Sequence, residues 1–280
     1  MAITNFISTV WSETLYESLD KQYVAVKNCN RDFDGEIKEA GSVVKICGVG
    51  EVSVFDYSKN TNIASMQTLS DTVVELEINR ARAFNFQIDD IDRAQSSPKL
   101  MQSAMKVAAS ALANDADEYV FGLYSQVPSN NTVKNTATNA ENIIDSIIAA
   151  REKLYMGNVN GNDEIVLEVS PQIASLILKS KINLSNDASD AALENGLIGN
   201  IAGCKVYVSN NVKSTTSSGT TFHKCFMRTR RAVAFASQIS EINAYRPESR
   251  FADAVKGLHL YGAKIVYQNE IVLLDLGIGA

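Results

Sequence analysis

The clearest alternation of apolar and polar positions runs from Gly35 to Arg82. Apolar residues take every second place in SVVKI, EVSVF and VVELEIN, and turn-forming residues separate these segments at CGVGE and DYSKNTN. A period of two is typical of β-strands with one buried face. The pattern therefore predicts a long β-hairpin. Because a two-stranded ribbon is marginally stable in water, it needs another surface to lie on.

A long amphipathic helix is predicted next. RAFNFQI continues the alternation into the acidic segment IDDID, and Ser97 and Pro98 then suit an N-cap and a first helical residue. Apolar residues recur at spacings of three and four, at Met101, Met105, Ala108, Leu112, Ala116, Tyr119 and Leu123. At ~1.5 Å per residue, this helix of roughly 27 residues is about 40 Å long. We interpret it as a structural spine.

Short helices and strands alternate from about 127 to 236, which predicts an α+β subdomain. Thr138 and Glu141 form a capping box for a helix that ends at Gly157, and Ser170 opens a second helix. The strands EIVLEV and CKVYVS flank that second helix. The polar segment NNVKSTTSSGTT is predicted to be a mobile loop. The last strands, LHLYGAKIVY and EIVLLDLGI, are predicted to return to the sheet that RAFNFQI begins.

Composition limits the class of protein. With 280 residues, 45% of them apolar and 21% charged, the chain is expected to be globular. The net charge of −6 and the scattered basic residues indicate no phosphate-binding stripe. The N-terminus has neither a basic region ahead of an apolar run nor the ~20 apolar residues of a membrane span. Its aromatic residues suit either an arm on a partner or a helix against its own core.

Residues that could carry chemistry have simpler interpretations. IDDID could hold a cation or supply paired carboxylates, but neighbouring arginines favour ion pairing; the residues are Asp89, Asp90, Asp92, Arg80, Arg82 and Arg93. NRDFDGEIKEAG begins like a calcium loop but has Gly41 where a bidentate carboxylate is needed, so a turn is favoured.

His223 and His259 lack metal and nucleophile motifs and are expected to be satisfied structural histidines. Four singly spaced cysteines, Cys29, Cys47, Cys204 and Cys225, are expected to be reduced packing residues. We predict no catalytic, cofactor-binding or metal-binding residue.

A short loop near the C-terminus carries charges of both signs between two strand-like segments. Its charged residues are Arg246, Glu248, Arg250 and Asp253. Exposed ion pairs contribute under ~1 kcal/mol each to stability. Across an interface, such charges fix the register and reject wrong partners. We therefore expect intersubunit contacts here, and also at the arginines and aspartates around IDDID.

Four separated blocks resemble the major capsid proteins of tailed bacteriophages with the Hong Kong 97-type fold, of the kind found in phages of Gram-positive bacteria. They are MAITNFI with Trp11, NRDFDGEIKEAGSVVKI, FNFQIDDIDRAQ and AYRPESRFADAVKGLHLYGAKIV. The resemblance implies an α+β capsid fold in four parts. These are an N-terminal arm at 1–30, an extended β-loop at 31–80, a peripheral domain with the spine helix at 81–126 and 237–280, and an axial domain at 127–236.

The function implied by this resemblance is structural. Copies of the chain would self-assemble as pentamers and hexamers of an icosahedral shell, inside the bacterial host cytoplasm, and enclose double-stranded DNA without specific binding. A separate scaffolding protein and a portal protein are expected, and no membrane partner. Three alternatives remain: an encapsulin-like compartment, a cytoplasmic metal-dependent hydrolase that uses IDDID, and a monomeric binding module that displays STTSSGTT.

Overall fold

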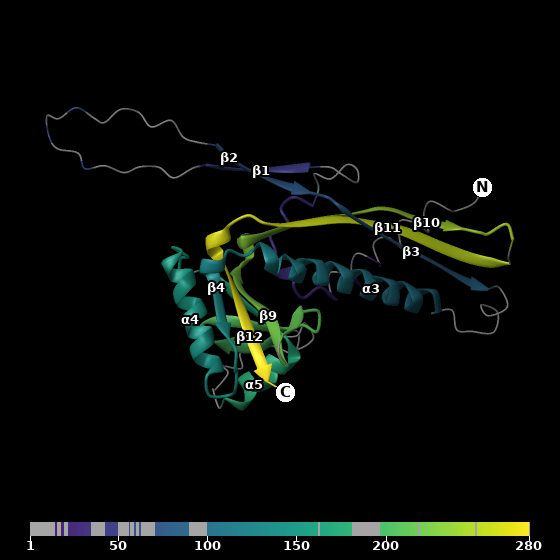
Figure 1. Cartoon of the computed structure of the whole chain (residues 1–280). Coiled ribbons are helices and arrows are strands. Elements are labelled where there is room, and N and C mark those ends of the chain that lie inside the picture. Colours follow the sequence, from purple (N-terminus) through teal and green to yellow (C-terminus); the bar gives the residue numbers. More distant parts are fainter. Residues whose placement is uncertain are drawn as a thin grey trace.

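Two β-sheets, a long helix and a projecting hairpin make up the described part of the chain. The computed structural model describes residues 15, 18–19, 22–34, 43–49, 56, 59, 62, 71–89, 100–161, 163–180, 197–217, 219–249 and 251–279. Figure 1 shows long strands running beside the helix α3, with a smaller body that contains α4 and α5 at one end of them.

The long strands form a three-stranded antiparallel sheet in the order β10–β11–β3. Its strands are β3 (Arg80–Asp89), β10 (Val233–Tyr245) and β11 (Ala252–Ile265). The predicted return of LHLYGAKI to RAFNFQI is confirmed, since Gly257 lies opposite Phe84. A Cβ at Gly257 would lie 2.4 Å from the Phe84 ring, so glycine allows this ring to lie across β11.

The spine helix α3 (Leu100–Gly122) covers one face of this sheet and continues into the 3₁₀ turn η2 (Leu123–Gln126). The ring of Tyr119 meets the ring of Tyr261 on β11 edge-on, with centroids 5.6 Å apart. The long helix is therefore confirmed. Its predicted cap, Ser97 and Pro98, lies outside the described residues.

The hairpin consists of β1 (Val43–Val49) paired antiparallel with β2 (Asp71–Glu77), which confirms the predicted ribbon over these residues. EVSVF lies outside the described residues. The base of the hairpin packs on the sheet face opposite α3, through Val44, Leu76 and Ile78 against Ala234, Ala236 and Leu260. The chain's own sheet thus supplies the supporting surface at the base.

The second sheet has seven strands in the order β4–β12–β9–β5–β7–β6, with β8 beside β9. Its strands are β4 (Thr132–Asn135), β5 (Ile165–Val169), β6 (Leu197–Ile201), β7 (Cys204–Val208), β8 (Ser214–Ser217), β9 (Thr220–Thr229) and β12 (Ile271–Gly279). It packs with the helices α4 (Ile143–Met156) and α5 (Pro171–Lys179). Short 3₁₀ turns join the elements, at η1 (Val26–Asn28), η3 (Ser129–Asn131), η4 (Arg230–Ala232) and η5 (Gln268–Glu270).

Two strand predictions are wrong. EIVLLDLGI does not return to the sheet of RAFNFQI, because η5 turns the chain and β12 pairs with β9 and β4 instead. Its first seven residues are all buried, as expected for a strand covered on both faces. The polar segment predicted as a mobile loop contains β8, which pairs with β9. All four residues of β8 are exposed, so no hydrophobic alternation marked it as a strand.

The helix ends agree with the sequence at two of three positions. Gly157 ends α4, and the Ser170 side chain accepts a hydrogen bond from the Ile173 amide at the start of α5. The predicted capping box of Thr138 and Glu141 is wrong. Asn139 Oδ1 instead accepts from the amides of Glu141 and Asn142, because α4 begins one turn later than the box requires.

Candidate assembly surfaces

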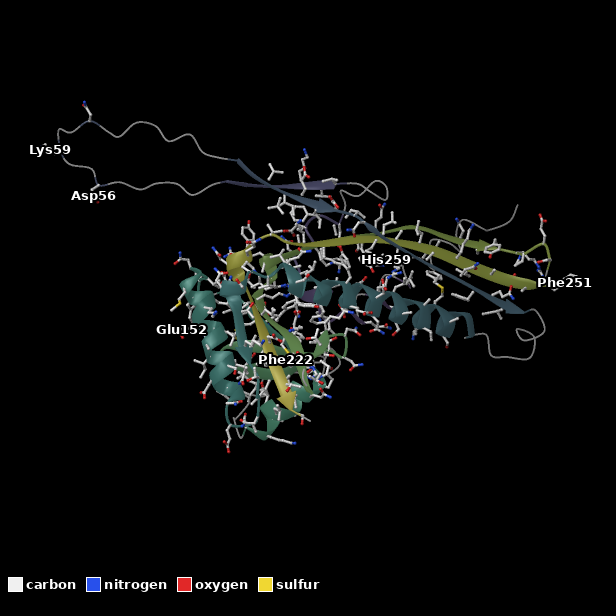
Figure 2. All side chains as sticks on the ribbon, in the orientation of Figure 1. Asp56, Lys59, Glu152, Phe222, Phe251 and His259 are labelled. Atoms are coloured by element: carbon white, nitrogen blue, oxygen red, sulfur yellow. The ribbon has the colours of Figure 1, made fainter. Side chains whose placement is uncertain are left out.

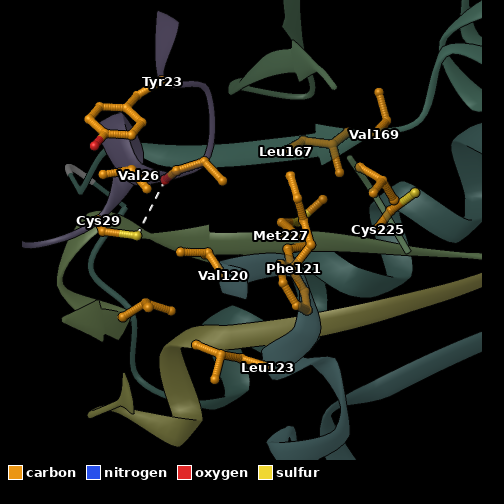
Figure 3. Close-up of a cluster of buried hydrophobic side chains, with 14 of the residues drawn as sticks. Tyr23, Val26, Cys29, Val120, Phe121, Leu123, Leu167, Val169, Cys225 and Met227 are labelled. Atoms are coloured by element: carbon orange, nitrogen blue, oxygen red, sulfur yellow. Dashed lines mark hydrogen bonds between the residues drawn. The ribbon is translucent and has the colours of Figure 1, made fainter. Parts of the chain in front are cut away.

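The segment before the hairpin lies in the chain's own core. Leu15, Leu19, Tyr23 and Val26 are buried. Figure 3 shows Tyr23, Val26 and Cys29 beside Val120 and Phe121 from α3 and Leu167 from β5. Of the two sequence interpretations for residues 1–30, packing on the chain's own core therefore holds for these described positions.

Asp117 fixes this segment to the spine helix. The side chain is 1% exposed, and its carboxylate accepts hydrogen bonds from the amides of Val24, Ala25 and Val26 at 2.9, 3.0 and 3.0 Å. Burial raises the pKa of Asp117 to about 6, while the three amide bonds act in the opposite direction. One carboxylate thus satisfies amides that the turn η1 leaves without helical partners.

A buried ion pair fixes the same segment to the second sheet. Arg228 on β9 donates from Nε and Nη2 to Glu168 on β5 at 3.0 and 2.9 Å, and both side chains are fully buried. Arg228 also donates to the carbonyls of Asn28 and Ala25, and the side-chain Nδ2 of Asn28 donates to Glu168. Sequence reasoning missed this network, because neither residue type nor spacing distinguishes it from surface charges.

The hairpin leaves the body through a tightly packed hinge at Ile78 and Asn79, between β2 and β3. A Cβ at Gly262 on β11 would lie 2.2 Å from the Glu77 carbonyl oxygen, so only glycine allows the chain to cross there. The Tyr119 hydroxyl donates to Asn79 Oδ1 at 3.1 Å. The spine helix and β11 together fix the direction in which the hairpin departs.

The predicted ion pairing around IDDID takes a different form. Arg82 pairs with Asp115 on α3 at 2.9 Å, and the Arg80 guanidinium lies 5.1 Å from the centroid of the Tyr119 ring. The structure describes only the backbone of Asp89, whereas Asp90 and Asp92 lie outside the described residues. The arginines therefore stabilise the packing of β3 on the helix.

The charged loop forms the turn between β10 and β11, as the sequence predicts. Arg246 and Glu248 are exposed, Asp253 is half-buried at the start of β11, and Arg250 lies outside the described residues. Phe251 is 81% exposed on the same turn, and Figure 2 shows it at the far end of the long sheet. Sequence reasoning missed Phe251, although an aromatic residue beside a charged turn was the available signal.

The described residues show no arrangement suited to metal chemistry. No three potential ligands from histidine, cysteine or carboxylate side chains gather among them. Burial lowers the pKa of His259 to about 4 and also lowers that of His223. Among the described residues, no protein group forms a hydrogen bond with either ring nitrogen of His223 or with Nδ1 of His259, so the structure does not confirm the prediction of satisfied histidines.

Three cysteines, Cys29, Cys204 and Cys225, are buried free thiols whose pKa values burial raises to about 11, 11 and 12. None of the helices in the described part of the chain has both the length and the apolar composition to cross a membrane.

Comparison with known families decides what these surfaces belong to. A family model described as phage capsid protein matches residues 71–269, which is more than half of the chain. The chain belongs to the phage capsid protein family. The predicted function, a major capsid protein of a tailed phage, is confirmed, and the role of this capsid protein is structural. A search of curated proteins found no match.

Solved structures confirm the Hong Kong 97-type α+β fold of this capsid protein. A chain from Mycobacterium phage Che8 is 30% identical, with a TM-score of 0.68 over 90% of this chain and 91% of that chain. The capsid of Ralstonia phage GP4 is 13% identical, with a TM-score of 0.71 over 94% and 90% of the two chains. A virus-like particle from Pyrococcus furiosus is 11% identical, with a TM-score of 0.56 over 98% and 100%, which shows the fold alone. The encapsulin alternative is therefore less supported.

Proposed function

We propose that this capsid protein closes an icosahedral phage head from pentamers and hexamers of itself, with each hairpin lying on a neighbouring copy. The hairpin carries the proposal. Its inner face is buried at the base, but Val43 and Val73 on its outer face are each 46% exposed. A ribbon with apolar side chains on both faces gains stability when a second surface covers the outer one.

The far half of the three-stranded sheet is a suitable surface for a neighbour's hairpin. Asn85, Tyr245 and Lys256 lie there on the face opposite α3, and all three are exposed. The Tyr245 hydroxyl donates to Asn85 at 3.1 Å, and the Lys256 ammonium lies 5.4 Å from the Tyr245 ring centroid. This polar platform is already ordered before a partner arrives, which reduces the entropy lost on docking.

The charged turn is a second proposed contact between copies. The charged residues of the turn would set the register between neighbouring capsomers, with Phe251 as the apolar anchor. They are Arg246, Glu248, Arg250 and Asp253. Aromatic anchors with charged surroundings are typical of the residues that dominate interface energies. The residues around IDDID remain proposed contacts between copies as well: Arg80, Arg82, Asp89, Asp90 and Asp92. The two arginines pack on α3, so they would contact a neighbour through the part of each side chain that stays exposed.

The remaining partners follow from this role. A separate scaffolding protein and a portal protein would assist assembly in the host cytoplasm, and the acidic chain, with its net charge of −6, would enclose double-stranded DNA without specific binding. We keep the proposed division into arm, extended β-loop, peripheral domain and axial domain. We revise it in two places: β12 is assigned to the axial domain, because it pairs with β9 and β4, and the whole of β10 is assigned to the peripheral domain, because it pairs with β11.

Expression of the chain with and without a scaffolding candidate, followed by negative-stain electron microscopy, tests the proposal. We expect closed shells, capsomer rings or tubes in at least one condition. A monodisperse monomer in both would overturn it. Shells that retain a cargo enzyme through a peptide tag and never package DNA would instead indicate the encapsulin-like function.

A further inference from the structure

The loop that joins α4 to β5 carries an asparagine directly before a glycine. Asn160 and Gly161 are both exposed, and they lie at the tip of this loop. Asparagine is one of the thermolabile residues. A glycine that follows it leaves its side chain unhindered, because glycine has no Cβ and a flexible backbone. The pair therefore has a chemical reactivity that the role of a capsid subunit does not use.

The loop is anchored on both sides of this pair. Before it, Val159 is 5% exposed in the core, and its amide donates to the Leu154 carbonyl at 3.2 Å. After it, the Asp163 carboxylate accepts a hydrogen bond from Arg231 at 3.0 Å. The freedom of the loop is therefore concentrated at the two residues of the tip and their immediate neighbour.

The backbone nitrogen of Gly161 is open to reaction. Among the residues that the structure describes, no carbonyl accepts a hydrogen bond from the Gly161 N–H. A Cβ built on Gly161 would have no neighbour within 4 Å, so no other part of the chain crowds the residue on that side. The turn is closed instead by the Asp163 amide, which donates to the Asn160 carbonyl at 3.0 Å.

We propose that Asn160 is a site of spontaneous deamidation through a succinimide. The Gly161 nitrogen gives up its proton to solvent and attacks Cγ of Asn160. A bond forms between this nitrogen and Cγ, the bond from Cγ to Nδ2 breaks, and Nδ2 leaves as ammonia. Water then opens the ring at either of its carbonyls, which gives aspartate or isoaspartate at position 160. Water is the only co-reactant.

The change would alter the charge and the backbone of the loop. Either product adds a carboxylate close to Asp163 and Glu164 in the sequence. Arg231 joins this loop to the turn η5, since it donates to Asp163 at 3.0 Å and to Glu270 at 2.8 Å, so the new carboxylate would compete for it. Isoaspartate also lengthens the backbone by one carbon, which moves the Asn160 carbonyl away from the Asp163 amide. Because water does not restore the amide, the modified fraction increases with the age of the protein.

Ageing of the purified full-length chain in mildly alkaline buffer, followed by peptide mapping with mass spectrometry, tests the inference. We expect aspartate and isoaspartate to accumulate at position 160, and isoaspartate methyltransferase to transfer a labelled methyl group to that peptide. Asn200 is the internal control, because it is exposed on β6 but is followed by the β-branched Ile201, and it should stay intact. The mapping also separates this site from the pair Asn195–Gly196, which lies outside the described residues.

Gly161→Ala is the matched variant. The new Cβ would meet no neighbour and the φ of Gly161 is not positive, so the fold should be retained. The added methyl group hinders the attacking nitrogen and restricts the backbone, so we expect conversion at Asn160 to slow several-fold. Equal rates in the wild type and the variant would contradict attack by this nitrogen.

Two further results would overturn the inference. One is an Asn160 that stays intact in the folded chain while it converts in the chain unfolded by guanidinium chloride, since the fold would then protect the site. The other is aspartate without isoaspartate, which would indicate direct hydrolysis instead of a ring. Neither result depends on shell formation, so this inference and the proposed function can fail separately.

Discussion

At the residue scale, the N-terminal segment is attached by buried polar groups at two sites. Asp117 on the spine helix holds the amides of residues 24–26, and the Arg228–Glu168 pair contacts residues 25 and 28. Burying such groups costs free energy unless every donor and acceptor is satisfied. The hydrogen bonds of these buried groups are directional, so they fix the position of the segment more precisely than apolar packing alone would.

Replacing Asp117 should remove the pH dependence that its raised pKa gives to the stability of the fold. Its pKa is about 6 in the folded chain and about 4 when unfolded. Between these values the folded state holds a proton that the unfolded state has lost, so this contribution to stability is present at low pH and disappears as pH rises through 6. The stability difference between wild type and Asp117→Asn, from urea unfolding, should shrink by about 2 kcal/mol from pH 4.5 to 7.5. A difference that does not change with pH would contradict the assignment, and Glu118→Gln is the exposed neighbouring control.

Replacing one partner of the buried ion pair should cost more stability than replacing both partners together. Arg228→Met alone leaves the Glu168 carboxylate buried without its partner, which costs roughly 3–5 kcal/mol. The double variant Arg228→Met, Glu168→Met should lose clearly less than the sum of the two single variants. Chemical denaturation of all four proteins gives the coupling energy. Additive losses would show that the two charges act independently.

At the element scale, the hairpin and the spine helix were predictable because their signals are local. A period of two or of 3.6 needs no knowledge of the rest of the chain, and Gly157 and Ser170 act on their own helices. The partner of a strand is not local. β12 has the same apolar composition whichever sheet it joins, and only the turn at η5 directs it to β9. Asp117 is similarly indistinguishable in sequence from a solvated helix residue.

Gly262, the glycine of β11 that lies against the hinge, should affect assembly more than folding. In Gly262→Ala the new Cβ would meet the Glu77 carbonyl, so the hairpin must lift or rotate away from β11. We expect a stability loss of about 1–3 kcal/mol and little or no shell formation. Urea unfolding and electron microscopy measure the two effects separately. Gly122→Ala is the control, because its Cβ would have no neighbour within 4 Å. Normal shells from Gly262→Ala would show that the hairpin direction is not critical.

At the scale of the whole molecule, the exposed features lie at separate places. The hairpin and α4 lie on one side, and the charged turn with Phe251 lies at the far end of the long sheet (Figure 2). The charged turn was predictable, because two strand-like segments bracket it in the sequence. The exposed apolar residues of α4, which are Ile148, Tyr155 and Met156, were not predictable, since an exposed stripe and a buried one look alike without the packed sheet beside them.

Charge reversal at the turn should separate assembly from folding. Arg246→Glu with Arg250→Glu replaces a charge pattern that the proposal assigns to contacts between capsomers, where like charges are strongly unfavourable. We expect shell yield to fall at least about tenfold, since ~1.4 kcal/mol already gives that factor. The melting temperature should stay within a few degrees of wild type. A well-formed shell that carries both reversals would remove the turn from the interface.

A cryo-electron microscopy reconstruction of the assembled shell, at a resolution that traces the hairpin, tests the central claim most directly. The account predicts that each hairpin lies on the three-stranded sheet of a neighbouring copy, with Val43 and Val73 covered and Asn85, Tyr245 and Lys256 beneath it. A closed shell in which the outer face of the hairpin, with Val43 and Val73, contacts no neighbouring copy would contradict it.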